Sequence, residues 1–381
     1  MLKIDRPYPV EPGEIPDPDR LARYLRGAIK GLGCPIEFFK FQAGNSNLTY
    51  LVRGGGRELV VKREPPGAKA KSAHDMRREH RVISAVHDVY PLAPQPLLLC
   101  EDPEVIGGAF FVMERVPGVI VRQASAAELS DAQAGVQFQR LITALAELHS
   151  VSIEAEPLAA LGRPAGYRLR QVQGWINRLA DARTPETPDT GDLETWLLAN
   201  QPEEPERAAL VHNDFKLDNL AWDSADPTRL VAVLDWEMAT LGDPLMDLGV
   251  TLSFWAQEDD PPGFRALRSM PSDRPGVPGR EVAWLRYLER RSERSQALAY
   301  YLTFAFYRRA VIEQQKFARY RSGQSADPRF AELNGDVIVL LDMARRQMAL
   351  KVRESQSSSP EDAWRASESG RPPSSSASPR P

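Results

Sequence analysis

Three side chains in the second half of the chain are of the types that phosphoryl transfer needs. Asp214 and Asn219 stand in the segment VHNDFKLDNLAWD (211–223), and Asp235 follows the apolar run VAVL (231–234). Transfer of a phosphoryl group requires a carboxylate that orients and deprotonates the attacking hydroxyl, and oxygen ligands for the cation that bridges the nucleotide phosphates. We therefore interpret Asp214 as the catalytic base and Asn219 and Asp235 as ligands of Mg²⁺.

Two further polar residues of the same segment fit this chemistry. His212 is expected to brace the loop without transferring a proton, and Lys216 could reach the transferring phosphoryl group as a point charge. Asp and Asn also suit turns that have no function. That alternative is weakened because His212-x-Asp214-x-x-x-x-Asn219, followed by the Asp of LDWE (234–237), matches every defined position of a kinase catalytic loop.

Composition and charge argue against several other classes of protein. Of the 381 residues, 42% are hydrophobic, which suffices for a substantial core, and the net charge of −4 gives no reason to expect a nucleic-acid partner. The two cysteines cannot form a disulfide framework or a cysteine zinc site, and the five histidines show no metal-ligand spacing. The N-terminus has no apolar signal region, and the apolar runs are too short to span a bilayer. We expect a cytoplasmic protein without a membrane or nucleic-acid partner.

The pattern of elements around these residues predicts an α+β fold. Short β-prone runs occupy residues 36–62, a helix is expected over 72–87 with Ser72 as its N-cap, and two more strands follow within 97–116. Helical patterns flank the strand-like segments that carry the polar residues, at 129–150, 167–179, 193–200, 244–255, 281–291, 295–321 and 331–352. We divide the chain into an N-terminal extension (1–35), a small lobe (36–116), a large lobe (117–352) and a disordered Ser- and Pro-rich tail (353–381).

The two segments that carry the candidate catalytic residues, 211–223 and 231–237, resemble those of aminoglycoside-phosphotransferase-like kinases, as does GDPLMDLG (242–249) after them. These kinases are enzymes with the protein-kinase fold that act on small molecules. Four other segments are similar to the branch of this family that also occurs fused to acyl-CoA dehydrogenases: GNSNLTYLV (44–52), LVVKREPPG (59–67), HDMRREHRVISAV (74–86) and YLTFAFYRRAVIEQQKFAR (301–319). The resemblance covers about residues 36–348. It implies a bilobed protein-kinase-like fold, with a small antiparallel sheet and one helix in the first lobe and a larger, mainly helical second lobe. It also implies Mg²⁺ and ATP or GTP as cofactors.

The resemblance assigns residues to the nucleotide site. Lys62 is the expected partner of the nucleotide phosphates, and Glu79 on the following helix is expected to pair with it. A loop that covers the phosphates is expected at Gly44, Asn45, Ser46 and Asn47, and a hinge that reads the base at Met113, Glu114 and Val116. Taken alone, the first of these segments could be an ordinary hairpin turn.

Three residues outside the nucleotide site are expected to support it. Asp243 could simply cap a helix that begins at Pro244. Asp247 resembles the residue that braces the catalytic loop through its backbone. A packed or capping role is expected of His149.

The acceptor is expected to be a small hydroxylated molecule. Asp235-Trp236-Glu237 lacks the glycine of the protein-kinase motif Asp-Phe-Gly, and no activation-loop pattern follows, which disfavours a protein substrate. Arginine suits phosphate or carboxylate recognition, although it could equally cover a solvated helix face, and residues 281–321 are rich in it: Arg286, Arg290, Arg291, Arg294, Arg308, Arg309 and Arg319. We therefore favour an anionic metabolite, and the branch fused to acyl-CoA dehydrogenases implies a hydroxyacyl-CoA. The alternatives are an aminoglycoside kinase, which needs an acidic acceptor surface, and a nucleotide-binding module without activity.

Overall fold

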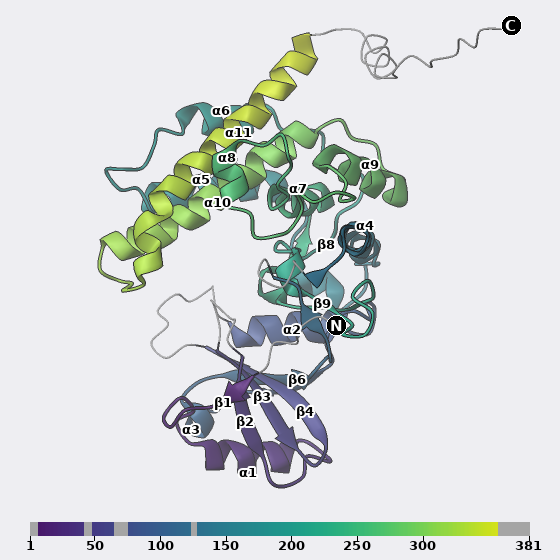
Figure 1. Cartoon of the computed structure of the whole chain (residues 1–381), viewed down its shortest axis with the longest axis vertical. Coiled ribbons are helices and arrows are strands. Elements are labelled where there is room, and N and C mark those ends of the chain that lie inside the picture. Colours follow the sequence, from purple (N-terminus) through teal and green to yellow (C-terminus); the bar gives the residue numbers. More distant parts are fainter. Residues whose placement is uncertain (1–6, 42–47, 65–74, 123–127, 357–381) are drawn as a thin grey trace, which may run out of the picture.

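The chain folds into a small lobe around an antiparallel sheet and a larger, mainly helical lobe (Figure 1). The structure, a computed structural model, describes residues 7–41, 48–64, 75–122 and 128–356, with side chains up to residue 350. The α+β, bilobed class predicted from the sequence is confirmed.

The small lobe is built on six strands in the order β1-β2-β3-β4-β6-β5. Their bounds are Tyr8–Pro9 (β1), Glu37–Lys40 (β2), Leu48–Gly54 (β3), Arg57–Arg63 (β4), Pro96–Cys100 (β5) and Phe110–Glu114 (β6). Helix α2 (Met76–Val86) packs against β5 and β6 and lies between the sheet and the large lobe. Its N-cap is Asp75, whose carboxylate accepts two backbone N–H groups of the first turn; Ser72 lies outside the described residues.

The segment before residue 36, expected to be an extension, contributes a strand and a helix to the small lobe. β1 pairs with β2, and helix α1 (Pro18–Ala28) buries Leu21 and Leu25 among apolar side chains of β3, β4 and β6. The β3–β4 turn also approaches this segment closely: a Cβ on Gly55, whose φ is +60°, would lie 2.5 Å from the Gly33 nitrogen. The small lobe as folded therefore begins before residue 36.

Truncating Leu25 to alanine is expected to destabilise the protein by about 2–5 kcal/mol, because its side chain is fully buried and its removal leaves a cavity. The measurement is the urea midpoint of Leu25→Ala, with Arg23→Ala, an exposed position on the same helix, as the control. If the first 35 residues were an appendage, both variants would stay within about 0.5 kcal/mol of the parent chain.

In the large lobe, the segments with Asp214, Asn219 and Asp235 adjoin the strands of two small antiparallel sheets, β10-β9-β7 and β11-β8. The strands are Val119–Ile120 (β7), Ala209–Val211 (β8), Leu220–Trp222 (β9), Leu230–Val233 (β10) and Thr240–Gly242 (β11). Residues 212–219 connect β8 to β9, and Asp235 follows β10. Because β9 and β10 are antiparallel and Leu220 pairs with Val233, Asn219 and Asp235 come to the same end of one sheet.

Helices enclose these sheets. α10 packs along α11 and against α7 and α5, and one apolar core runs from the large lobe to α2. The large-lobe helices are α4 (Asp131–His149), α5 (Tyr167–Asp181), α6 (Gly191–Ala199), α7 (Pro244–Ser253), α8 (Pro262–Ala266), α9 (Arg280–Arg291), α10 (Leu298–Arg321) and α11 (Leu333–Gln356). Two short helices were not predicted from the sequence: α8 and, in the small lobe, α3 (Pro103–Ile106). Within the described part of the chain, no helix is both long and apolar enough to cross a membrane.

Candidate active site

A cavity of about 400 Å³ between the lobes brings together most of the residues that the sequence singled out. Those that line it are Lys62, Glu79, Met113, Glu114, Val116, Asp214, Lys216, Asn219 and Asp235. Gly44, Asn45, Ser46 and Asn47 lie outside the described residues, but Phe41 and Thr49 on either side of them line the cavity. His212, Asp243 and Asp247 do not line it.

Lys62 joins the two lobes through two carboxylates. Its Nζ lies 2.7 Å from Glu79 Oε1 on α2 and 2.9 Å from Asp235 Oδ1 in the large lobe. Burial would lower the pKa of Lys62, but the charges of Glu79 and Asp235 outweigh burial and raise that pKa. Burial would raise the pKa of Asp235, and the Lys62 ammonium outweighs this effect and holds the pKa below its ordinary value. Lys62 is therefore a fixed positive charge that an anion entering the cavity would meet.

The end of β6 forms a second wall of the same cavity. Met113, Glu114 and Val116 line it, and an ion pair between Glu114 and Arg57 ties this end of β6 to the neighbouring strand β4. A tied strand end presents backbone N–H and C=O groups at fixed positions, which is what recognition of a flat base edge requires.

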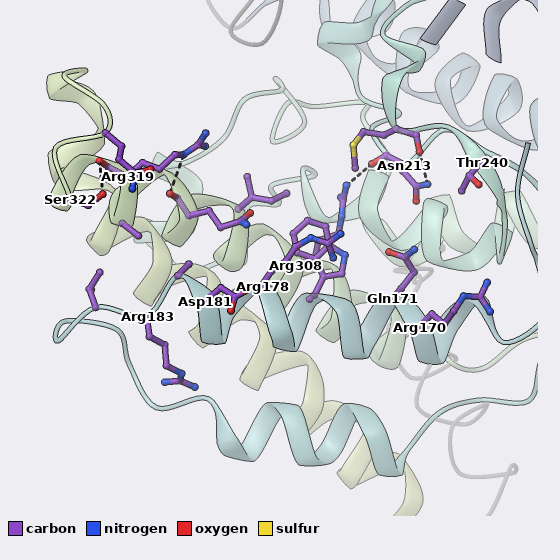
Figure 2. A pocket seen from close by; sticks show the side chains of 18 of the residues that line it. Arg170, Gln171, Arg178, Asp181, Arg183, Asn213, Thr240, Arg308, Arg319 and Ser322 are labelled. Carbon is purple, nitrogen blue, oxygen red and sulfur yellow. Dashed lines mark hydrogen bonds between the residues drawn. The ribbon is translucent and has the colours of Figure 1, made fainter. Parts of the chain in front are cut away.

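A larger cavity of about 1260 Å³ lies along α5 and α10, and we call it the α5–α10 groove (Figure 2). Its lining includes Asn213, whereas the next residue, Asp214, lines the cavity between the lobes. The two cavities therefore meet at the 212–219 loop.

The arginines noted in the sequence are only partly near this groove. Arg308 and Arg319 line it, but the arginines of α9 do not. Arg309 lies 4.4 Å above the ring of Phe254, whose ring is also 5.3 Å from Lys216 Nζ. The arginines of α5 and of the segment before it were not among the predicted site residues, although their density between residues 163 and 183 was a signal.

The 212–219 loop presents Asp214 and Asn219 as a hydrogen-bonded pair. Asn219 Nδ2 donates to Asp214 Oδ2 over 2.9 Å, and Lys216 Nζ lies 2.9 Å from the same oxygen. The chain reverses before Asp214 because Asn213 has φ +65°, a left-handed conformation that asparagine tolerates better than most residues. Since the amide nitrogen of Asn219 is occupied by Asp214, its Oδ1 is the atom available to a cation.

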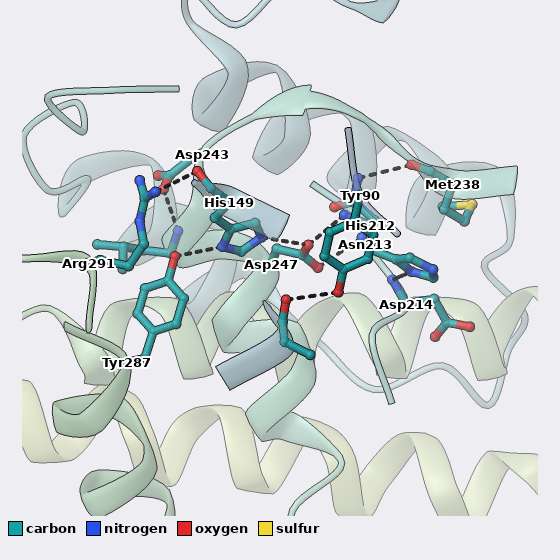
Figure 3. Close-up of polar contacts among 12 residues, drawn as sticks. Tyr90, His149, His212, Asn213, Asp214, Met238, Asp243, Asp247, Tyr287 and Arg291 are labelled. Carbon is teal, nitrogen blue, oxygen red and sulfur yellow. Dashed lines mark hydrogen bonds and ion pairs between the residues drawn. The ribbon is translucent and has the colours of Figure 1, made fainter. Parts of the chain in front are cut away.

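A buried carboxylate holds the start of this loop (Figure 3). Asp247 accepts the backbone N–H groups of His212 over 2.6 Å and of Asn213 over 2.8 Å, and His149 Nε2 lies 3.1 Å from it. The hydroxyl of Tyr287 is 2.6 Å from the other nitrogen of the His149 ring. Burial would raise the pKa of Asp247, but these hydrogen bonds outweigh burial and hold the pKa below its ordinary value. His149 thus orients the carboxylate that positions the loop.

His212 supports the loop through its ring. One ring nitrogen lies 3.0 Å from the carbonyl oxygen of Leu234, just before Asp235, and the other accepts the backbone N–H of Asp214 over 3.3 Å. Complete burial lowers the pKa of His212. A buried neutral ring between the two segments suits bracing better than proton transfer.

Replacing Asp247 by asparagine is expected to cost about 3–5 kcal/mol at neutral pH, because two backbone N–H groups and His149 lose a buried charge partner. The pKa of Asp247 is lowered by folding, so its stabilisation is present above the unfolded-state pKa and is lost as the pH falls through the folded-state value. Urea unfolding at neutral and acidic pH measures the effect. A difference from the parent chain that did not shrink toward acidic pH would contradict this role of the charge.

Asp243 has a structural account. Its Oδ1 accepts the backbone N–H of Leu245 over 2.8 Å and so caps α7, as the sequence suggested. Its other oxygen lies 2.7 Å from Arg168 of α5 and accepts the hydroxyl of Tyr301 of α10 over 3.1 Å. No local pattern indicated these two partners, which connect three helices far apart in the chain.

The oxygen atoms around Asp235 fit a hard cation. The carboxylates of Glu79, Asp235 and Glu237 lie within 4.8 Å of one another. Within the described part of the chain, Glu79 Oε2 is buried without a hydrogen-bond partner. Asp235 itself has φ +66°, and this turn of the backbone starts the 3-10 turn Trp236–Met238. Carboxylate and amide oxygens are the donors that Mg²⁺ prefers, and Asn219 contributes the amide.

Comparison with known proteins shows the family. Residues 39–280 match the model of the phosphotransferase enzyme family, APH. The chain belongs to this phosphotransferase family. The matched region contains Lys62, Glu79, the 212–219 loop, Asp235 and Asp247, and it ends before α10.

Individual members of the family and its relatives agree with this assignment. Mouse acyl-CoA dehydrogenase family member 10 is 33% identical over 310 residues, which cover 81% of this chain and 29% of that protein. The chain thus spans less than a third of that relative's length. A solved structure from Ralstonia eutropha, whose name places it among aminoglycoside phosphotransferases, has a TM-score of 0.74 and 27% identity over 87% of this chain and 98% of its own. The ADP-bound aminoglycoside phosphotransferase APH(2'')-Ib, with a TM-score of 0.52 and 17% identity over 86% and 99% of the two chains, shares the fold. The resemblance noted in the sequence is confirmed.

Proposed function

We propose that the protein is a kinase that transfers the terminal phosphoryl group of ATP to a hydroxyl group of a small metabolite. One observation carries the proposal: Lys62, bound to Glu79 and Asp235, shares a single cavity with Asp214 and Asn219. A cation that holds phosphates, a carboxylate base and two metal-binding oxygens are the parts that phosphoryl transfer needs in one place.

The residues of this chain have separate roles in the proposed reaction. Asp214 accepts the proton of the acceptor hydroxyl while that oxygen bonds to the γ-phosphorus and the bond to the β–γ bridging oxygen breaks, so that ADP leaves. Lys216, 2.9 Å from Asp214, offsets negative charge on the transferring group, and Lys62 holds the other phosphates. Mg²⁺ held by Asn219 and Asp235 would neutralise charge between the phosphates. His212 and Asp247 position the loop.

The remaining nucleotide contacts are part of the same proposal. Gly44, Asn45, Ser46 and Asn47 would cover the phosphates with backbone N–H groups, because small residues permit a close approach. Met113, Glu114 and Val116, at the tied end of β6, would read the base edge. An ADP-bound protein of the same fold supports ATP as the donor.

For the acceptor we propose a hydroxyacyl-CoA. Two observations support it: the relatives named for acyl-CoA dehydrogenases, and a groove beside the 212–219 loop that is rich in arginine. An aminoglycoside is the alternative, since solved structures of the same fold carry that name. A polycation needs acidic partners, however, and among the described residues that line the groove Asp181 is the only acid. A binding module without activity is disfavoured because Asp214, Asn219 and Asp235 are all present.

The test is turnover of ATP with Mg²⁺ by the purified protein against hydroxyacyl-CoAs, aminoglycosides, choline and homoserine. Phosphorylation of a hydroxyacyl-CoA, with one phosphate gained by mass, is the expected result. Phosphorylation of an aminoglycoside alone would overturn the acceptor, and failure to bind any nucleoside triphosphate would overturn the kinase.

A further inference from the structure

The α5–α10 groove carries an unbalanced positive charge. Six arginines among its lining residues have no carboxylate within ion-pair distance in the described part of the chain: Arg78, Arg163, Arg170, Arg178, Arg308 and Arg319. Arg183 and Arg321 also line it, but they pair with Glu194 at 3.6 Å and Glu186 at 2.7 Å. Like charges gathered in a concave surface repel one another and raise the local concentration of anions.

Several of these guanidinium groups are held in place by partners that leave their charge intact. Trp175 of α5 contacts two of them through its ring, with Arg178 4.7 Å and Arg308 5.1 Å from the ring centre. Arg170 donates to the backbone carbonyls of Arg163 and Ala165. An arginine fixed by a ring or a carbonyl keeps N–H groups for a ligand and loses little entropy when it binds one.

The groove reaches the 212–219 loop at one end. Arg308 donates to the carbonyl oxygen of Asn213 over 2.9 Å, and the Tyr167 hydroxyl donates to the side-chain oxygen of Asn213 over 3.0 Å. Figure 2 shows Asn213 and Arg308 together at this end, with Arg319 and Ser322 at the other. A molecule lying in the groove would therefore have one end next to the residue that precedes Asp214.

We propose that the α5–α10 groove binds the polyanionic part of the acceptor, phosphate or other oxyanion groups held by these arginines, while the acceptor hydroxyl extends past Asn213 to Asp214. This inference rests on the proposed function and adds to it the residues that select the acceptor. The α10 wall of the groove lies beyond residues 39–280, the part of the chain that matches the family model.

The test uses the full chain with ADP and Mg²⁺ at saturation, so that the nucleotide site is occupied, and the fluorescent polyanion 1,3,6,8-pyrenetetrasulfonate as the probe. The double variant Arg170→Gln/Arg178→Gln is expected to bind the probe at least about tenfold more weakly, because charge-assisted hydrogen bonds are lost. Arg286→Gln/Arg290→Gln removes the same charge from exposed positions of α9, which do not line the groove, and is expected to bind as the parent chain does. An equal loss in both variants, or none in the first, would overturn the proposal.

Two controls separate this inference from the proposed function. Binding of ATP with Mg²⁺ and dependence of turnover on Asp214 test the kinase, and they are measured on the same samples. With an acceptor that is phosphorylated, the groove variant should raise the KM for the acceptor and leave its kcat and the KM for ATP unchanged, and the probe should compete with the acceptor. If the KM for the acceptor changed neither in the groove variant nor in the presence of the probe, the groove would not bind the acceptor. Should the α5 variant melt at a lower temperature than the parent chain, Arg319→Gln on α10 repeats the test from the other wall.

Discussion

Asp214→Asn is expected to lower kcat by about 10³–10⁴-fold while the affinity for ATP with Mg²⁺ changes by less than about twofold. The amide keeps the shape of the carboxylate and can still accept the hydrogen bond from Asn219, which is 2.9 Å long. It cannot accept the proton of the acceptor hydroxyl. Only the rate of the step in which that proton is transferred should therefore fall.

The measurements are single-turnover phosphorylation and binding of ATP by calorimetry. Asp88→Asn, which makes the same chemical change at an exposed position away from the cavity, should leave both unchanged. A collapse of nucleotide affinity in Asp214→Asn would show that this carboxylate binds the metal and is not the base.

Several residues in the cavity between the lobes could be predicted because they lie close together in the sequence, at a spacing typical of phosphoryl transfer. Asp214 and Asn219 fall within one short segment just before β9, and Asp235 follows β10. Antiparallel pairing of β9 with β10 then brings the two ends together. Lys62 and Glu79 required the resemblance, because a lysine on a strand and a glutamate on a helix are ordinary surface residues until the fold places them 2.7 Å apart.

The place of α1 in the small lobe and the α5–α10 groove depend on contacts between distant segments, which no local sequence pattern predicts. Helix α1 has an apolar face at Leu21 and Leu25, but its Pro-rich surroundings suggested an extension, and only the sheet shows what that face covers. The arginines of α5 were missed for a similar reason. The spacing of apolar residues predicts a helix, but it does not show which polar side chains of that helix will face another helix. Arg178 lines a groove only because α10 packs beside α5.

The ion pair between Lys62 and Asp235 leads to the second large effect. In the free protein one carboxylate oxygen of Asp235 is 2.9 Å from Lys62, which also holds Glu79. A nucleotide with its cation must enter between these groups, so Asp235 exchanges a lysine partner for a divalent one. Its pKa lies below the ordinary value, and the carboxylate is ionised at neutral pH and ready to bind a cation.

Asp235→Asn is therefore expected to weaken binding of ATP in the presence of Mg²⁺ by about 100-fold, with turnover too low to detect, because a charged ligand of the cation becomes neutral. Binding of ATP with EDTA in place of Mg²⁺ should be at least as tight in the variant as in the parent chain, since Lys62 is retained and loses a competing negative partner. Asp214→Asn is expected to behave differently: it should keep its affinity for ATP with Mg²⁺ and lose only the rate of phosphoryl transfer.

Glu237→Gln gives the matched comparison, because its carboxylate lies within 4.8 Å of those of Asp235 and Glu79. If Asn219 and Asp235 hold the cation, Glu237→Gln should weaken Mg²⁺-dependent binding by less than about threefold, as expected for a nearby charge that is not a ligand. A loss as large as that of Asp235→Asn would assign Glu237 to the metal in place of Asn219. The cation would then lie toward α2, on the side of the cavity away from Asp214, and the proposed path of the proton would have to be redrawn.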